Sequence, residues 1–288
     1  MATTARSALL GGVVAVLGAA GVLAWRHHKG RLAPDLAAAV GDLAASLERV
    51  KEPEEAALVR SVCERPKDAC DCVALAARHG LDANLGAPTL DLLGKAEQRC
   101  KGRPAVAGMK AEALARVQRL EEARHQAEVT VSTAPGDMYA NLALGLVAFE
   151  KLSLKEALEP TERALAAGRG AEAHRLLGRI ALSRGAFGLA LDHFSKVIVE
   201  RPHDAEAAFT AAMCNANMGR YNAAREGFVR VLRIDPKHVE ARLRLALMSL
   251  EIGARMEAEH HLRELRKIAP NDPRLEPLEA ALSSRPPQ

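Results

Sequence analysis

A spacing of 33 to 34 residues that recurs through the second half of the chain constrains the fold more than any other feature. An alanine recurs at Ala123, Ala157, Ala190, Ala224 and Ala258. In the same frame, a small residue recurs at Ala111, Gly145, Gly178, Ala212 and Ala246, and a proline at Pro135, Pro202, Pro236 and Pro270, with Arg169 in place of one proline. Each period has room for two helices, and one such pair cannot bury its apolar face alone. The period therefore predicts helix pairs that stack and share a core, with alanine and glycine allowing the helices to approach closely.

The best-defined period runs from Ala171 to Asp204 and resembles a tetratricopeptide repeat. Its matching residues are Leu177 and Gly178 on the first predicted helix, Ala190, Phe194 and Val197 on the second, and Pro202 at the turn. The resemblance covers residues 104–272 in five repeats. It implies an all-α fold, a right-handed α-solenoid of stacked antiparallel helix hairpins. The sequence departs from the family at the large aromatic residue usual near the start of each first helix, where it has Ala107, Asn141, His174, Ala208 and Arg242.

The segments beside the repeats are also helical in pattern. Within 32–103, apolar spacing and the breaks at Pro53, Pro66, Gly80 and Pro88 predict helices at about 35–51, 54–64, 69–79 and 88–101. These four helices have the alternation of two hairpins without a clear repeat signature. The C-terminal segment 273–288 is predicted to form a capping helix from Pro273 to Ser284, whose charged residues face water.

The N-terminal segment 1–31 contains an uncharged stretch from Ser7 to Trp25. A helix of that length comes close to the thickness of the bilayer hydrocarbon, so we expect a single transmembrane helix before the solenoid. The alternative is a signal peptide cleaved near Ala24. The basic residues Arg26, Lys29 and Arg31 follow the segment and favour a cytoplasmic body, because basic flanks prefer the cytoplasm.

Four cysteines, Cys63, Cys70, Cys72 and Cys100, fall close together and favour the opposite side of the membrane. Residues two apart on a helix point about 200° away from each other, so one of Cys70 and Cys72 can face Cys63 and the other Cys100. Two disulfides are therefore predicted, and such clusters are typical of oxidising compartments. Direct pairing of Cys70 with Cys72 is disfavoured, and the other two connectivities stay open. The competing interpretation is a four-thiolate zinc site in a reducing cytosol, although the usual C-x-x-C spacing is absent.

The resemblance implies a concave working surface lined by the first helix of each repeat. The positions that match are Leu142, Leu146, Phe149, Arg175, Arg179, Phe209, Met213, Asn217, Leu243 and Leu247. Such a groove is largely apolar, with Arg175 and Arg179 as a basic step. It suits an amphipathic helix or an extended peptide, with the two arginines available for a carboxylate. The alternative for each apolar residue is ordinary packing between repeats.

The sequence contains no motif of catalysis. Glycine loops that bind phosphate, H-E-x-x-H pairs, nucleophile elbows and C-x-x-C redox motifs are absent. The adjacent pairs His27-His28 and His260-His261 diverge around a helix, so they form no chelating face and are expected at the surface. No cofactor or metal is predicted. A net charge of +4 from 40 basic and 36 acidic residues, with 3% aromatic residues, argues against a nucleic acid partner.

Three functions follow in order of preference. The first is a membrane-tethered scaffold on the extracytoplasmic side, which binds other proteins through its groove as part of an envelope complex. The second is a cytosol-facing adaptor that recruits soluble proteins to the membrane. The third is an enzyme or metal-dependent regulator that uses the four clustered cysteines. The sequence identifies neither the partner nor the oligomeric state.

Overall fold

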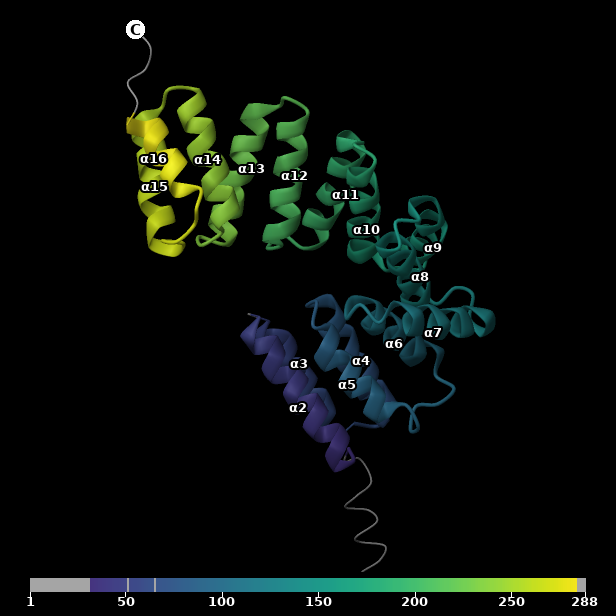
Figure 1. The fold of residues 1–288 in the computed structure, drawn as a ribbon. Coiled ribbons are helices and arrows are strands. Elements are labelled where there is room, and N and C mark those ends of the chain that lie inside the picture. The colour runs from purple at the N-terminus through teal and green to yellow at the C-terminus, as the bar shows by residue number, and fades with distance from the viewer. Residues whose placement is uncertain (1–31, 51, 65, 284–288) are drawn as a thin grey trace, which may run out of the picture. The chain divides into compact units, whose positions relative to one another are not determined.

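The computed structural model describes residues 32–50, 52–64 and 66–283. This part of the chain forms 15 α-helices and contains no strand, so the all-α prediction is confirmed (Figure 1). The predicted membrane segment Ser7–Trp25 and the pair His27-His28 lie outside the described residues. None of the described helices combines the length and apolar character needed to cross a membrane.

The helices divide between two compact units, Met1–Ala143 and Leu144–Gln288, with the division inside α8 (Met138–Glu150). The first unit contains α2 (Pro34–Arg49), α3 (Pro53–Glu64), α4 (Ala69–Asp82), α5 (Gly86–Ala96), α6 (Pro104–Arg116) and α7 (Leu120–Thr133). The second contains α9 (Leu154–Ala166), α10 (Gly170–Ser183), α11 (Phe187–Glu200), α12 (Ala205–Asn217), α13 (Tyr221–Ile234), α14 (Val239–Glu251), α15 (Arg255–Ile268) and α16 (Leu275–Ser283). The predicted boundary between segments 32–103 and 104–272 marks the start of the repeats. The division into compact units after Ala143 does not test that boundary.

Two of the helices predicted before the repeats have wrong boundaries. The third helix continues past Gly80 to Asp82, because the missing side chain there lets α4 approach α5: a Cβ on Gly80 would lie 2.2 Å from Oγ1 of Thr89. The fourth helix begins at Gly86 and ends at Ala96, not 88–101. Pro88 falls in its first turn, where the missing N–H has no helical partner to lose.

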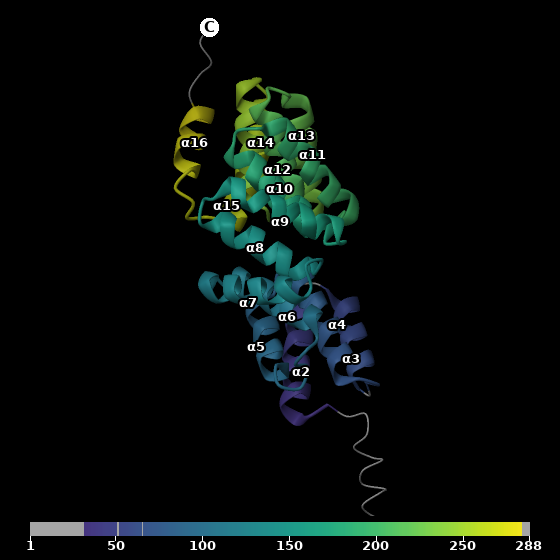
Figure 2. The same ribbon diagram turned by 90° about the vertical axis from the view of Figure 1, so that its right-hand side faces the viewer.

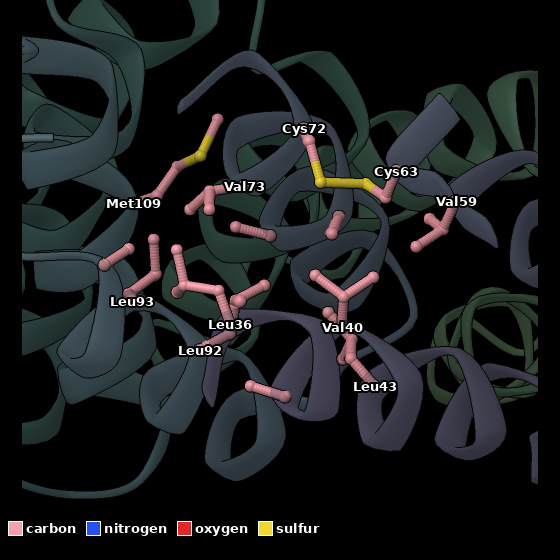
Figure 3. Packing of buried hydrophobic residues seen from close by; sticks show 14 of the residues in the cluster. Leu36, Val40, Leu43, Val59, Cys63, Cys72, Val73, Leu92, Leu93 and Met109 are labelled. Carbon is pink, nitrogen blue, oxygen red and sulfur yellow. A yellow bond between two sulfur atoms is a disulfide. The ribbon is translucent and has the colours of Figure 1, made fainter. Parts of the chain in front are cut away.

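The core of the first unit joins α2 to α6 (Figure 3). Leu36, Val40 and Leu43 of α2 are buried against α4 and α5, and Leu92 and Met109 continue the cluster into α5 and α6. Figure 2 shows α3 beside α4, while α2 packs on both α3 and α5. This region is a small helical bundle whose core includes three of the paired cysteines, Cys63, Cys72 and Cys100.

Small residues set the spacing of the helix pairs in the repeats. All five periodic alanines are fully buried, with 0% exposure at Ala123, Ala157, Ala190, Ala224 and Ala258. A Cβ on Gly145 would lie 2.2 Å from Oγ1 of Thr161, and one on Gly178 would lie 2.8 Å from the Phe194 ring. Glycine at these two positions therefore leaves the space that the facing side chain occupies.

The turn between the two helices of each repeat contains one residue with positive φ. These residues are Gln118 (63°), Leu152 (61°), Gly185 (69°), Gly219 (73°) and Gly253 (75°). Their spacing repeats that of the buried alanines, and three of the five are glycine, the residue that adopts this conformation without strain.

The second unit ends in α16, which packs on α14 and α15. Leu275, Leu278 and Leu282 of α16 are buried in a cluster with Leu262 and Leu265 of α15. The predicted capping helix is present but shorter, because it begins at Leu275 rather than Pro273.

Candidate functional site

The predicted groove residues fall into two registers on the first helices of the repeats. The first register is Leu142, Arg175, Phe209 and Leu243, and the second is Leu146, Arg179, Met213 and Leu247. Members of the two registers are four residues apart, which is about one turn along the same face of a helix. The side chains of the two registers differ in their exposure to solvent.

The first register is largely occupied by packing. Leu142 is 1% exposed and Leu243 is 6% exposed, so the prediction that these two line an open groove is wrong. Leu243 belongs to the core that α14, α15 and α16 share. Phe209 is half-buried: its ring centroid lies 5.6 Å from that of Phe228 and 5.0 Å from that of His238, which it stacks on. Leu142, Phe209 and Leu243 therefore pack wholly or partly against other side chains of the protein.

Arg175, the basic member of the first register, is paired within the protein. Its Nη2 donates to the carboxylate of Asp204, and its Nε lies 3.9 Å from Oε2 of Glu172. Burial lowers the pKa of Arg175, but the two carboxylates outweigh burial and hold the pKa above its usual value. The prediction that Arg175 is available for a ligand carboxylate is therefore wrong, because Asp204 already fills that role.

The second register is the more open one. Leu146 and Met213 are half-buried, Leu247 is 40% exposed, and the side chain of Arg179 is 41% exposed. Phe149 is half-buried one turn beyond Leu146. Asn217 is exposed one turn beyond Met213, and its Nδ2 donates to the Met213 carbonyl at 2.8 Å. We call the residues Leu146, Phe149, Arg179, Met213, Asn217 and Leu247 the first-helix surface.

The single cation of the first-helix surface, Arg179, contacts two other residues of the protein. The guanidinium carbon of Arg179 lies 4.3 Å from the centroid of the Phe149 ring, within the range of a cation–π contact. Nη2 of Arg179 donates to Oε1 of Glu150 at 3.0 Å. Since this cation already has a carboxylate partner, the surface presents mainly apolar contacts and little net charge.

The cysteines of the first unit form two disulfides. Cys63 pairs with Cys72 and Cys70 with Cys100, with Cα–Cα distances of 5.3 and 5.6 Å. Asp68 caps α4 by accepting from the N–H of Cys70 at 2.7 Å, so the bridges meet at the start of α4. This is one of the two connectivities that the sequence left open.

The thiols needed by the four-thiolate zinc alternative are consumed by these bridges. Across residues 32–50, 52–64 and 66–283, no group of three His, Cys, Asp or Glu side chains is arranged to hold a metal ion. The remaining cysteine, Cys214, is buried in the repeats, and burial raises the pKa of its thiol. A thiol in that environment is held in its unreactive, protonated form.

His261 is buried, so its predicted surface position is wrong. Its side chain faces Arg225 of α13, Arg242 of α14, and His260 and Glu257 of α15. Burial, followed by the charges of His260 and Arg242, lowers the pKa of His261 to about 4, and Glu257 opposes the shift. His261 is therefore neutral at pH 7 and packs as a core residue.

A second histidine contact was missed entirely from the sequence. Nδ1 of His174 lies 3.1 Å from Nδ1 of His193, which joins the two helices of the third repeat. Burial lowers the pKa of both imidazoles, so one neutral ring donates and the other accepts. The available signal was that His174 replaces the large aromatic residue usual near the start of a first helix.

Comparisons with known proteins agree with this architecture. The chain is similar to the solved structure of YrrB, described as a TPR protein with an unusual peptide-binding site, at 24% identity and a TM-score of 0.54, covering 66% of this chain and 99% of that one. It is similar to a chain of the APC/C hetero-tetramer Cut9-Hcn1 at 17% identity and a TM-score of 0.62, covering 84% of this chain and 48% of that one, about half of its length. A structure of MamA (AMB-1) matches at 21% identity and a TM-score of 0.51, covering 64% and 98%. At these identities the structures show the fold alone.

Sequence comparison identifies the repeats directly. No curated protein matches the chain. Models of the tetratricopeptide repeat match residues 109–172, 161–205 and 218–282, which together make up more than half of the chain. The chain therefore belongs to the tetratricopeptide repeat family.

Proposed function

We propose that this protein is a scaffold that binds an apolar helix or peptide of a partner protein on the first-helix surface. The observation that carries the proposal is the second register, in which Leu146, Arg179, Met213 and Leu247 stay accessible while the register one turn away is packed. Accessible apolar side chains at matching positions on the first helices of successive repeats form a row that an amphipathic helix or extended peptide can contact. YrrB, with a similar fold, is itself described by its peptide-binding site.

The ion pairs refine the expected partner. Arg175 and Arg179 each have a carboxylate partner within the protein, so an acidic peptide gains little from them. A bound apolar segment would cover Met213 and Leu247 without breaking either pair. The proposed ligand is therefore an uncharged, apolar face, in place of the carboxylate that the sequence suggested.

Peptide selection on the full chain tests this proposal. Peptides are selected from a random library, and their Kd is measured by fluorescence anisotropy against Met213→Glu combined with Leu247→Glu. Two buried carboxylates at the contact should weaken binding at least about 10-fold, since each costs more than 1 kcal/mol when desolvated. Val199→Glu is the matched control, because Val199 is exposed but outside the first-helix surface. Equal affinity of the double variant and the control would refute the assigned surface.

The location of the scaffold is the second part of the proposal. We place the folded body on the extracytoplasmic side of a membrane, tethered by Ser7–Trp25 within an envelope complex. The two disulfides support this side, because structural disulfides persist in oxidising compartments. The basic flank after the apolar segment supports the cytosol-facing adaptor, which is the competing location.

Thiol trapping in intact cells separates these locations. Disulfide exchange is quenched with acid, the protein is denatured, and free thiols are labelled with or without prior reduction and counted by mass. Four thiols that label only after reduction support the extracytoplasmic location, while Cys214 labels on denaturation alone. All five labelling without reduction would refute both the disulfides in the cell and the proposed side.

A further inference from the structure

Two imidazole rings meet between the helices of the third repeat. His174 of α10 is 8% exposed, and His193 of α11 is half-buried. Their Nδ1 atoms are 3.1 Å apart and their ring centroids are 5.3 Å apart, so the two nitrogens lie between the rings and face each other. The contact therefore joins the two helices of one hairpin.

The distance between the two nitrogens is that of a hydrogen bond. A metal ion on the line between them would need about 4 Å, since each metal–nitrogen bond takes about 2.0 Å. A separation of 3.1 Å is instead within the range of an N–H donor and its acceptor. One Nδ1 must therefore carry a hydrogen while the other presents its lone pair.

The number of protons on the pair decides whether this hydrogen bond can exist. A first added proton can bind Nε2 of the donor ring, which leaves the bond between the two Nδ1 atoms in place. A second proton has only the accepting Nδ1 left to bind, because Nε2 of that ring already carries a hydrogen. Two cationic rings would then face each other at this short distance, with no acceptor between them.

The charges that act on the pair come from α11. Lys196 opposes protonation of both rings, whereas Glu200 favours it at His174 and Asp192 favours it at His193. Within the described part of the chain, α9 and α12 also pack on this hairpin but contribute none of these charges. Burial is the largest effect and lowers the pKa of both imidazoles below the usual 6.5, so the pair gains protons only in acid.

We propose that His174 and His193 form an acid-sensitive latch, which joins α10 to α11 in neutral solution and releases them when both rings are protonated. The sign follows from the lowered pKa values: the unfolded chain binds the extra protons, so the stability is present above pH 6.5 and is lost as the pH falls. Because α10 packs on α9 and α11 on α12, release of this hairpin reaches the repeats on both sides.

Amide hydrogen exchange on the full chain tests the latch. Exchange is measured at pH 7.5 and pH 5.0, corrected for the intrinsic rate at each pH, and read in peptides from α10 and α11. The test variant is His193→Asn, whose amide oxygen can accept from His174 in either charge state of that ring and cannot itself be protonated. The matched control is His203→Asn, because His203 is an exposed histidine in the turn after α11.

A second variant, His174→Phe, guards against a folding defect in the first. It restores the large aromatic residue usual at this position and leaves no facing nitrogen, so it should also lose the acid response. If one of the two variants is already open at pH 7.5, the other gives the comparison. The effect of acid on His261 is common to all of these proteins and cancels between them.

Between pH 7.5 and pH 5.0, the opening constant of α10 and α11 should rise about 10-fold more in the unmodified protein than in His193→Asn. The reason is that loss of the hydrogen bond and repulsion between the rings act together. His203→Asn should behave as the unmodified protein. The same rise in His193→Asn and in the control, or no rise in the unmodified protein, would overturn the proposal. Neither result depends on peptide binding, so the scaffold function is tested separately.

Discussion

The two disulfides of the first unit can be ranked by the length of chain that each one closes. Cys63 and Cys72 are separated by 9 residues, and Cys70 and Cys100 by 30. If a disulfide acts by restricting the unfolded chain, loops of these lengths contribute about 2.6 and about 3.6 kcal/mol. The bridge between Cys70 and Cys100 should therefore stabilise the unit more, by about 1 kcal/mol.

The perturbation is replacement of each pair by alanine, so that no lone thiol is left to form a wrong bridge. The buried Cys63, Cys72 and Cys100 lose one sulfur atom each, a small loss of packing that is similar for the two pairs. Removing Cys63–Cys72 should raise the equilibrium constant for opening of α4 and α5 about 80-fold, and removing Cys70–Cys100 about 400-fold.

Amide hydrogen exchange measures these opening constants locally, which matters because a chain of two units need not unfold in one step. Peptides from α4 and α5 should lose more protection when Cys70–Cys100 is removed than when Cys63–Cys72 is removed. Protection of peptides from α12 and α13 should stay unchanged. The loops closed by the two bridges overlap along the sequence. Each variant keeps one bridge, and its exchange is compared with that of the protein that has both. If removing the bridge of the shorter loop raised the opening constant more, or if both removals raised it only a few-fold, restriction of the unfolded chain would not be the source of the stabilisation.

Two further predictions concern the repeats. Gly178→Ala should destabilise the second unit by about 1 kcal/mol, because crowding of the buried Phe194 ring costs about 1 to 3 kcal/mol and the gain in helix propensity returns about 1 kcal/mol. The control in urea denaturation is Gly188→Ala, which should be neutral or stabilising, because the nearest atom to the added Cβ is the Met218 sulfur at 3.9 Å. Equal effects of the two substitutions would contradict the close-packing role of Gly178. His261 has a folded pKa of about 4, below its usual 6.5, so its unfolded form binds the extra proton and stability is lost as pH falls from 6.5 towards 4. Between pH 7.5 and pH 5 this amounts to about 2 kcal/mol. In urea denaturation at the two pH values, His261→Asn should reduce the difference in free energy of unfolding by that amount, and an unchanged difference would place His261 in water.

Much of the fold could be predicted because the same pattern of small residues occurs in all five repeats. A single buried alanine is ambiguous, but five at one spacing define the register of ten helices. The helices before Pro104 have no such repetition, so their ends had to be inferred from individual breakers. Gly80 and Pro88 misled that inference, because each is compatible with a helix where a close neighbour or a first turn requires it.

The candidate surface could be predicted only to within one helical turn. Family position identifies the face of each first helix, but it does not say where along that face neighbouring repeats stop touching. Leu243 and Leu247 illustrate the limit, since both are leucine on the same face and only the second is exposed. The partners of Arg175 and Arg179 come from other helices, 29 residues away in each case, a separation that no local pattern reveals.

Close packing inside a repeat depends on summed volume across the helix pair rather than on one conserved residue. In the third repeat, Gly178 on the first helix leaves room for Phe194 on the second. The fourth repeat also has a buried phenylalanine, Phe228, but Ala212 stands where the glycine was. The space is restored from the other side, because Gly227 on the second helix faces Ala212, and a Cβ there would lie 2.6 Å from the Ala212 Cβ. The glycine has moved across the interface, so the repeat keeps its spacing while the sequence at either single position changes.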